Sequence, residues 1–127
     1  MYQSKLSSAD VDELFDAILT LENRDECYRF FEDVCTANEL ISIAQRFQVA
    51  KMLYEKMTYT EIEKATGAST ATISRVNKCM VYGAEGYGLV LARLAAARGK
   101  TNAAPHKQDK QAGETREAAR AEKEKKK

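Results

Sequence analysis

Hydrophobic residues recur at helical spacing through most of this chain, separated by polar residues on a period near 3.6. One such stripe lies in residues 8–21, a second in residues 24–35, and a longer one begins at residue 36. Because an α-helix places positions three and four apart on one face, each stripe predicts an amphipathic helix. The stripe positions are Val11, Leu14, Phe15, Ile18 and Leu19, then Cys27, Phe30, Phe31 and Val34, then Leu40, Ile43, Ala44, Phe47, Ala50 and Leu53.

The expected helix starts share a capping pattern. A small polar residue that can accept a hydrogen bond from the first turn is followed three residues later by an acidic residue. These pairs are Ser7 and Asp10, Asn23 and Glu26, Thr36 and Glu39, and Thr58 and Glu61. The last pair predicts a short helix that ends near Ala65.

A glycine turn follows that short helix. Gly67 can adopt the left-handed conformation that ends a helix, and Ser69 can cap a further helix from Thr70 to about Met80. Two short helices joined by such a turn have the form of a helix-turn-helix. The residues expected to pack between them are Ile62, Ala65, Ala68, Ile73 and Val76.

The remaining pattern completes an all-α prediction with two parts. Three glycines in residues 82–88 indicate a flexible joint, and residues 89–98 predict a last short helix. Residues 99–127 contain no large apolar side chain, so they predict a disordered charged tail. We therefore expect residues 1–98 to form a helical dimerisation and helix-turn-helix DNA-binding domain. The tail could strengthen attachment to DNA or be only a solvated extension.

The first two expected helices have apolar faces that are wide for so short a chain. A domain of about 98 residues buries only part of its apolar surface by itself. A second identical chain is the simplest partner, so the sequence predicts a homodimer. A small monomeric bundle is the alternative.

Charge is distributed unevenly, although the net charge is only +1. Residues 1–39 carry three Lys or Arg against ten Asp or Glu, whereas residues 40–83 carry six against three. The tail carries nine against five. The middle of the chain and the tail could therefore approach a polyanion, whereas the acidic first part would face away from it. The alternative, which charge alone favours, is that these are simply solvated faces.

Several classes of protein lack support in the sequence. No apolar run approaches the roughly 20 residues that span a bilayer, and no secretory signal begins the chain, so we expect a cytoplasmic protein that does not enter the membrane. The three cysteines include no C-x-x-C pair, and we expect them to be small core residues rather than a metal or disulfide site. His106 is the one histidine and lies in the polar tail. Without a phosphate-binding loop or a catalytic constellation, an enzyme is not predicted.

The second helix of the expected pair carries small, hydroxyl-bearing and basic residues. Hydroxyls can bond to bases or phosphates, a Thr or Ala methyl can contact a thymine methyl, and cations can contact phosphates. These properties favour double-stranded DNA as the partner. The candidate DNA-binding residues on this helix are Thr70, Ala71, Thr72, Ser74, Arg75 and Lys78.

The stretch from about Val34 to Met80 resembles the Trp repressor family, in particular its YerC/YecD-like branch. The resemblance is carried by Thr36, Glu39, Arg46, Leu53 and the run MTYTEIEKATGASTATISR, and the helical order fits over roughly residues 8–98. It implies a bacterial transcriptional regulator with a Trp-repressor-like helical bundle. It also implies an intertwined homodimer whose recognition helices enter successive major grooves of a palindromic operator.

The resemblance also implies roles for individual residues. Thr70, Ala71 and Ser74 would face bases, with Thr72 and Lys78 nearer the DNA backbone. Thr60, on the first helix of the motif, stands where the family repressor has a base-contacting Arg. Since Thr cannot form the bidentate contact that Arg makes with guanine, the operator is expected to differ.

An effector site is implied by position, at Thr36, Arg46, Arg75 and Cys79. Two Arg residues at the positions of Arg46 and Arg75 flank the tryptophan of the family repressor. However, Val76 stands where the repressor has Gly, and Cys79 where it has Ser. The added isopropyl group argues against tryptophan as the effector, and no cofactor is certain. Alternatives are a salt bridge of Arg46 with Glu39 or Glu55, a phosphate contact for Arg75, and a helix cap for Thr36.

A second interpretation remains open at this stage. The helix pair could belong to a protein-interaction module that docks on a transcription-related partner, with the acidic first part as the contact and no sequence-specific DNA binding. Alanine at Thr70, Ser74 and Arg75 would abolish DNA affinity in the first case and would have no effect on the second.

Overall fold

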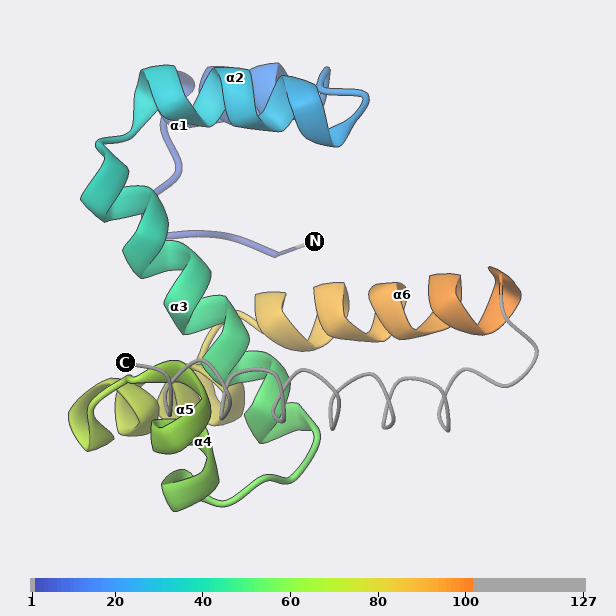
Figure 1. Cartoon of the computed structure of the whole chain (residues 1–127). Coiled ribbons are helices and arrows are strands. Elements are labelled where there is room, and N and C mark those ends of the chain that lie inside the picture. The colour runs from blue at the N-terminus through green and yellow to red at the C-terminus, as the bar shows by residue number, and fades with distance from the viewer. Residues whose placement is uncertain (1, 102–127) are drawn as a thin grey trace. The chain divides into compact units, whose positions relative to one another are not determined.

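The computed structural model describes residues 2–101, and the regular secondary structure in this part of the chain is all α-helix (Figure 1). The expected all-α fold is thereby confirmed. The expected disordered tail lies outside the described residues from residue 102 onward. The helices are α1 (Ala9–Ile18), α2 (Arg24–Val34), α3 (Ala37–Tyr54), α4 (Tyr59–Thr66), α5 (Thr70–Tyr82) and α6 (Gly86–Thr101). The chain divides into two compact units, and the division falls within α3, after Ser42.

The first unit contains α1, α2 and the start of α3, and its helix starts are close to those expected. The cap of α1 is Ser8, whose hydroxyl accepts from the Val11 amide at 3.1 Å, so the expected start at Ser7 is wrong by one residue. Asn23 caps α2 by accepting from the Glu26 amide at 2.9 Å, as predicted. Neither α1 nor α2 contains a buried residue.

The second unit contains the hydrophobic core of the described residues. The core residues are Val49, Ala50, Ile62, Ala68, Ile73, Val76 and Leu91. Of the predicted interior of the helix-turn-helix, Ile62, Ala68, Ile73 and Val76 are buried, and Ala65 is half-buried. Burial of these side chains fixes α4 against α5, because each helix contributes them from one face.

The turn of the motif forms as its residues predict. Thr58 and Glu61 make a complete capping box at the start of α4. Gly67 ends this helix with φ of 74°, in the left-handed region that glycine adopts without steric cost. Ser69 then caps α5 by accepting from the Thr72 amide at 3.1 Å.

The expected flexible joint at residues 82–88 is wrong in its second half. Helix α6 begins at Gly86, so Gly86 and Gly88 are helical, and the helix continues past the expected domain boundary at residue 98. Tyr87 and Leu91 pack on the core from this helix. Glycine lowers helix stability by about 1 kcal/mol per residue, and packing of the neighbouring side chains outweighs this cost.

The cysteines are not core residues in the single chain. Cys27 and Cys79 are exposed and Cys35 is half-buried, and none of the three belongs to the hydrophobic core of the described residues. Among residues 2–101, no helix combines the length and the apolar character needed to cross a bilayer.

Candidate nucleic-acid interface

Helix α5 has two distinct faces. Ile73 and Val76, three residues apart, are fully buried in the core, with exposed fractions of 0% and 1%. The opposite face is exposed and presents Thr70, Ala71, Ser74, Arg75 and Lys78. The buried pair therefore anchors the helix, while its small, hydroxyl-bearing and basic residues stay accessible to a ligand.

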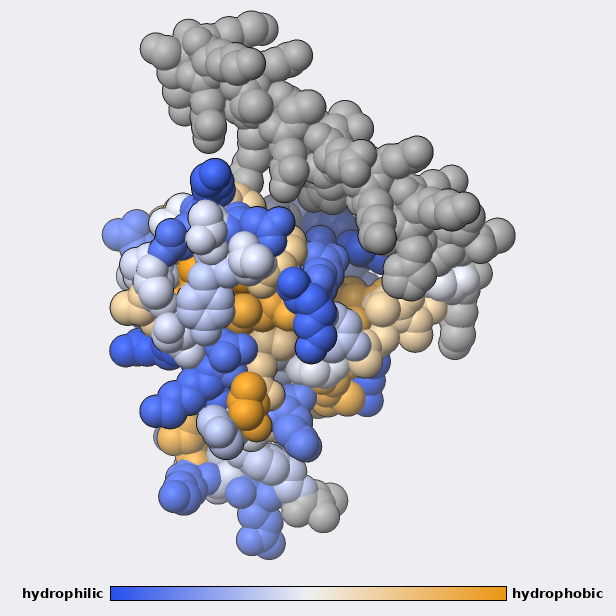
Figure 2. All heavy atoms as spheres, turned by 90° about the horizontal axis from the view of Figure 1, so that it is seen from below, coloured by the Kyte–Doolittle hydropathy of each residue, from blue (hydrophilic) through white to orange (hydrophobic). Residues whose placement is uncertain are grey.

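Arg75 and Lys78 are available to a negatively charged ligand. Within residues 2–101, neither side chain forms a hydrogen bond or an ion pair. Thr60 is also exposed, in the first turn of α4. Figure 2 shows the molecule from below the view of Figure 1, which is the side on which α4 lies in that figure. Hydrophilic side chains cover much of this face, and hydrophobic patches show between them. Such a mixed surface leaves its charged groups accessible to solvent and to a polyanion.

The hydroxyl groups at the start of α5 are already engaged within the protein. The hydroxyls of Ser69 and Thr72 are hydrogen-bonded to each other at 3.1 Å, and Thr72 is half-buried. The Thr70 hydroxyl donates to the Glu63 carboxylate of α4. Sequence reasoning missed Glu63, because the two residues are seven positions apart and meet only across the Gly67 turn.

The positions expected to hold an effector are divided between the two units. Arg46 is half-buried on α3, and Arg75 and Cys79 are exposed on α5, all in the second unit. In the described part of the chain, Arg46 forms no ion pair with Glu55, one of the two acidic partners considered for it. Val76 is buried in the core, and its isopropyl group fills space that glycine would leave empty.

Thr36 belongs to the first unit, where it caps α3. Its hydroxyl accepts from the Glu39 amide at 3.1 Å, and the Glu39 carboxylate accepts from the Thr36 amide at 2.8 Å. Hydrogen bonding from the Thr36 amide, and to a smaller extent from the Thr36 hydroxyl, holds the pKa of the Glu39 carboxyl below its ordinary value, because both favour the charged carboxylate. The amide and hydroxyl of Thr58 lower the pKa of Glu61 in the same way at the start of α4.

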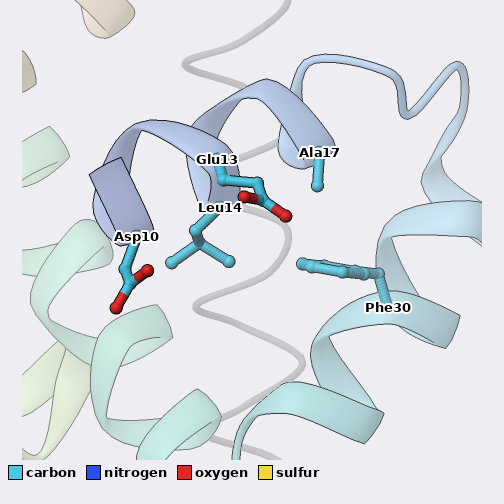
Figure 3. A pocket seen from close by; sticks show the side chains of 5 residues that line it. All are labelled: Asp10, Glu13, Leu14, Ala17 and Phe30. Atoms are coloured by element: carbon cyan, nitrogen blue, oxygen red, sulfur yellow. The ribbon is translucent and has the colours of Figure 1, made fainter. Parts of the chain in front are cut away.

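The helices of the first unit leave apolar side chains uncovered. Phe15 on α1 is 56% exposed, and Leu19, the C-cap of this helix, is 80% exposed. A shallow pocket of about 350 Å³ lies between α1 and α2, where the Leu14 and Phe30 side chains border the same space (Figure 3). Asp10 and Glu13 line it as well and give it an acidic border. Among the described residues of this unit, the apolar faces of the two helices are covered only in part, since Phe30 is half-buried while Phe15 stays exposed.

The fold and the accessible face of α5 define a helix-turn-helix protein, and comparison with known proteins identifies its family. The profile of the Trp repressor protein family matches residues 9–95. This chain belongs to the Trp repressor family, whose members are DNA-binding regulators and not enzymes.

Relatives of known sequence and structure agree with this assignment. The uncharacterized protein YerC of Bacillus subtilis (strain 168) is 53% identical over 94 residues, which cover 74% of this chain and 90% of YerC. A crystal structure from Staphylococcus aureus, provisionally described as a Trp repressor, is 57% identical, with a TM-score of 0.69 over 72% of this chain and 91% of that one. A TrpR-like protein from Eubacterium eligens ATCC 27750 is 58% identical, with a TM-score of 0.70 over 72% and 94%.

Proposed function

We propose that this protein is a sequence-specific transcriptional regulator that binds a palindromic DNA operator as a homodimer. The observation that carries the proposal is the division of α5 into two faces. Ile73 and Val76 hold one face in the core, and the exposed face consists of residues suited to base and phosphate contacts. An anchored helix with an accessible polar face is the element that helix-turn-helix proteins insert into the major groove.

Residues of the exposed face divide by chemistry. Thr70, Ala71 and Ser74 are small enough to let the helix approach base edges, and they would make the sequence-reading contacts. Arg75 and Lys78 would contact phosphates, together with the half-buried Thr72 and with Thr60 on α4. Phosphate contacts supply most of the affinity and make it fall steeply with salt.

The homodimer is supported by the first unit. Helices α1 and α2 have no buried residue, yet they carry large apolar side chains at helical spacing. A second copy of the chain would cover this surface and would present a second α5. Two recognition helices related by a twofold axis suit an operator with two half-sites.

The proposal is tested by selecting bound sequences from random DNA with the purified full-length chain. We expect a palindrome whose half-sites lie about one helical turn apart. Repeating the selection with a panel of amino acids tests whether a carboxylate ligand acts through Arg46 and Arg75. Tryptophan is expected to have no effect. Val76 stands where the family repressor has glycine, and its side chain fills the space at that position.

A substitution separates DNA binding from protein docking. Arg75→Ala is expected to weaken operator binding about tenfold or more, because it removes one cation from each recognition helix. Arg29→Ala on α2 removes another exposed arginine, outside the proposed DNA interface, and should leave affinity unchanged. Enrichment of no sequence, or equal affinity of the Arg75→Ala variant, would refute the proposal and favour a protein-interaction module.

A further inference from the structure

A hydrogen bond links the two helices of the motif at the end that faces DNA in the proposed function. Glu63 is half-buried in the last turn of α4, and Thr70 is the exposed first residue of α5. The Thr70 hydroxyl donates to Glu63 Oε1 across the Gly67 turn. A carboxylate therefore lies next to the side chain that is expected to reach the base edges first.

This hydrogen bond determines which way the Thr70 hydroxyl can act. A hydroxyl has one proton and two acceptor lone pairs, whereas a carboxylate only accepts. The proton of Thr70 is therefore directed toward Glu63, and a ligand meets only the lone pairs of the hydroxyl oxygen. The Thr70 hydroxyl can therefore act only as a hydrogen-bond acceptor toward a ligand.

The charge of Glu63 acts in the same direction. The first turn of α5 contains no acidic residue of its own, so Glu63 supplies the negative charge at the positive end of this helix. A phosphate or a carbonyl oxygen placed beside this carboxylate would be repelled. An amino group would be attracted.

We propose that Glu63 is a specificity-determining residue that makes Thr70 select an amino group in the major groove. Cytosine N4 and adenine N6 are amino donors there, while guanine O6 and thymine O4 are acceptors. The operator base nearest Thr70 is therefore cytosine or adenine. This inference rests on the proposed function, because it assigns a base preference to the same helix.

The test is a comparison of operators selected from random DNA by the full-length chain and by variants. We expect the wild-type chain to prefer C or A over T or G by about tenfold at one position in each half-site. Glu63→Gln should reduce this preference to about twofold or less, because an amide can also donate to Thr70 and carries no charge. Glu63→Lys should favour G or T at the same position.

Two further variants separate specificity from folding. Thr70→Val keeps the shape of the side chain, lacks the hydroxyl and lies at an exposed position. It should therefore lose the preference with little change in the thermal midpoint. Glu55→Gln removes a carboxylate from the exposed turn after α3 and should keep the wild-type preference.

Each outcome decides between the two proposals. If the wild-type chain enriches no sequence, both the proposed function and the role of Glu63 are wrong. If it enriches a palindrome and Glu63→Gln or Thr70→Val enriches the same one, the protein binds DNA specifically but Glu63 does not determine the base. A selective loss of the amino preference in both variants supports the assignment.

Discussion

In the second unit of the chain, Ile62, Ile73 and Val76 are buried almost completely, whereas α1 and α2 in the first unit contain no buried residue. Both regions nevertheless carry large apolar side chains at helical spacing. The second unit buries apolar side chains of its helices against its own residues, whereas the first unit leaves those of α1 and α2 without full burial. An apolar stripe therefore predicts an amphipathic helix, and it does not by itself show whether the same chain covers the apolar face.

The largest expected effect is on assembly and comes from a charge in the first unit. Ile41 on α3 is 65% exposed in the single chain, and a second copy is expected to cover it. Ile41→Asp should raise the dissociation constant of the dimer by roughly 100-fold or more, because a buried unpaired carboxylate is strongly unfavourable in both protomers.

Sedimentation equilibrium of the wild-type chain and both variants measures this effect. Ser42→Asp introduces the same charge at the next, already polar position and should leave the dimer intact. If the wild-type chain sediments as a monomer at all concentrations, the first unit remains uncovered in solution. The exposed apolar side chains of α1 and α2 would then not be explained by a second copy of the chain.

The second prediction concerns the core of the second unit. Val76→Ala should lower the free energy of unfolding by about 2–3 kcal/mol, because two buried methyl groups are removed and the core relaxes only in part. Val81→Ala on the same helix truncates a side chain that is 61% exposed and should cost less than about 0.5 kcal/mol. Urea unfolding at one fixed protein concentration measures both. Equal losses would show that Val81 is covered in the assembled protein.

The smallest expected effect is a pH dependence of the helix caps. The pKa of Glu61 is lower in the folded chain, so its carboxylate contributes stability at neutral pH. This contribution is lost as the pH falls below about 4.3 and through the lowered pKa. Glu61→Gln can still accept from the Thr58 amide and cannot titrate, so its urea midpoint should fall less between neutral pH and about pH 3.

Glu55→Gln is the matched control, because Glu55 is exposed and caps no helix in the described residues. Its acid sensitivity should equal that of the wild-type chain. If Glu61→Gln is as acid-sensitive as the wild type, the capping box is not what loses stability in acid.

Much of the helix-turn-helix could be predicted because its signals are local. The capping box of Thr58 and Glu61, the left-handed Gly67 and the cap at Ser69 each depend on partners within three or four residues. Such short-range hydrogen bonds and backbone preferences depend only on residues that are close together in the sequence, so the sequence alone predicts them. The exposed residues of α5 followed from the same pattern, since its buried positions repeat at helical spacing.

The sequence by itself determined the helical fold, the turn and the polar face of α5. Tertiary structure alone decided that Gly86 and Gly88 are helical, because Tyr87 and Leu91 pack on the core, and that Cys27 and Cys79 are exposed. It also brought Glu63 to Thr70. These outcomes depend on contacts between different helices, and no pattern within one helix specifies which side chain it will meet.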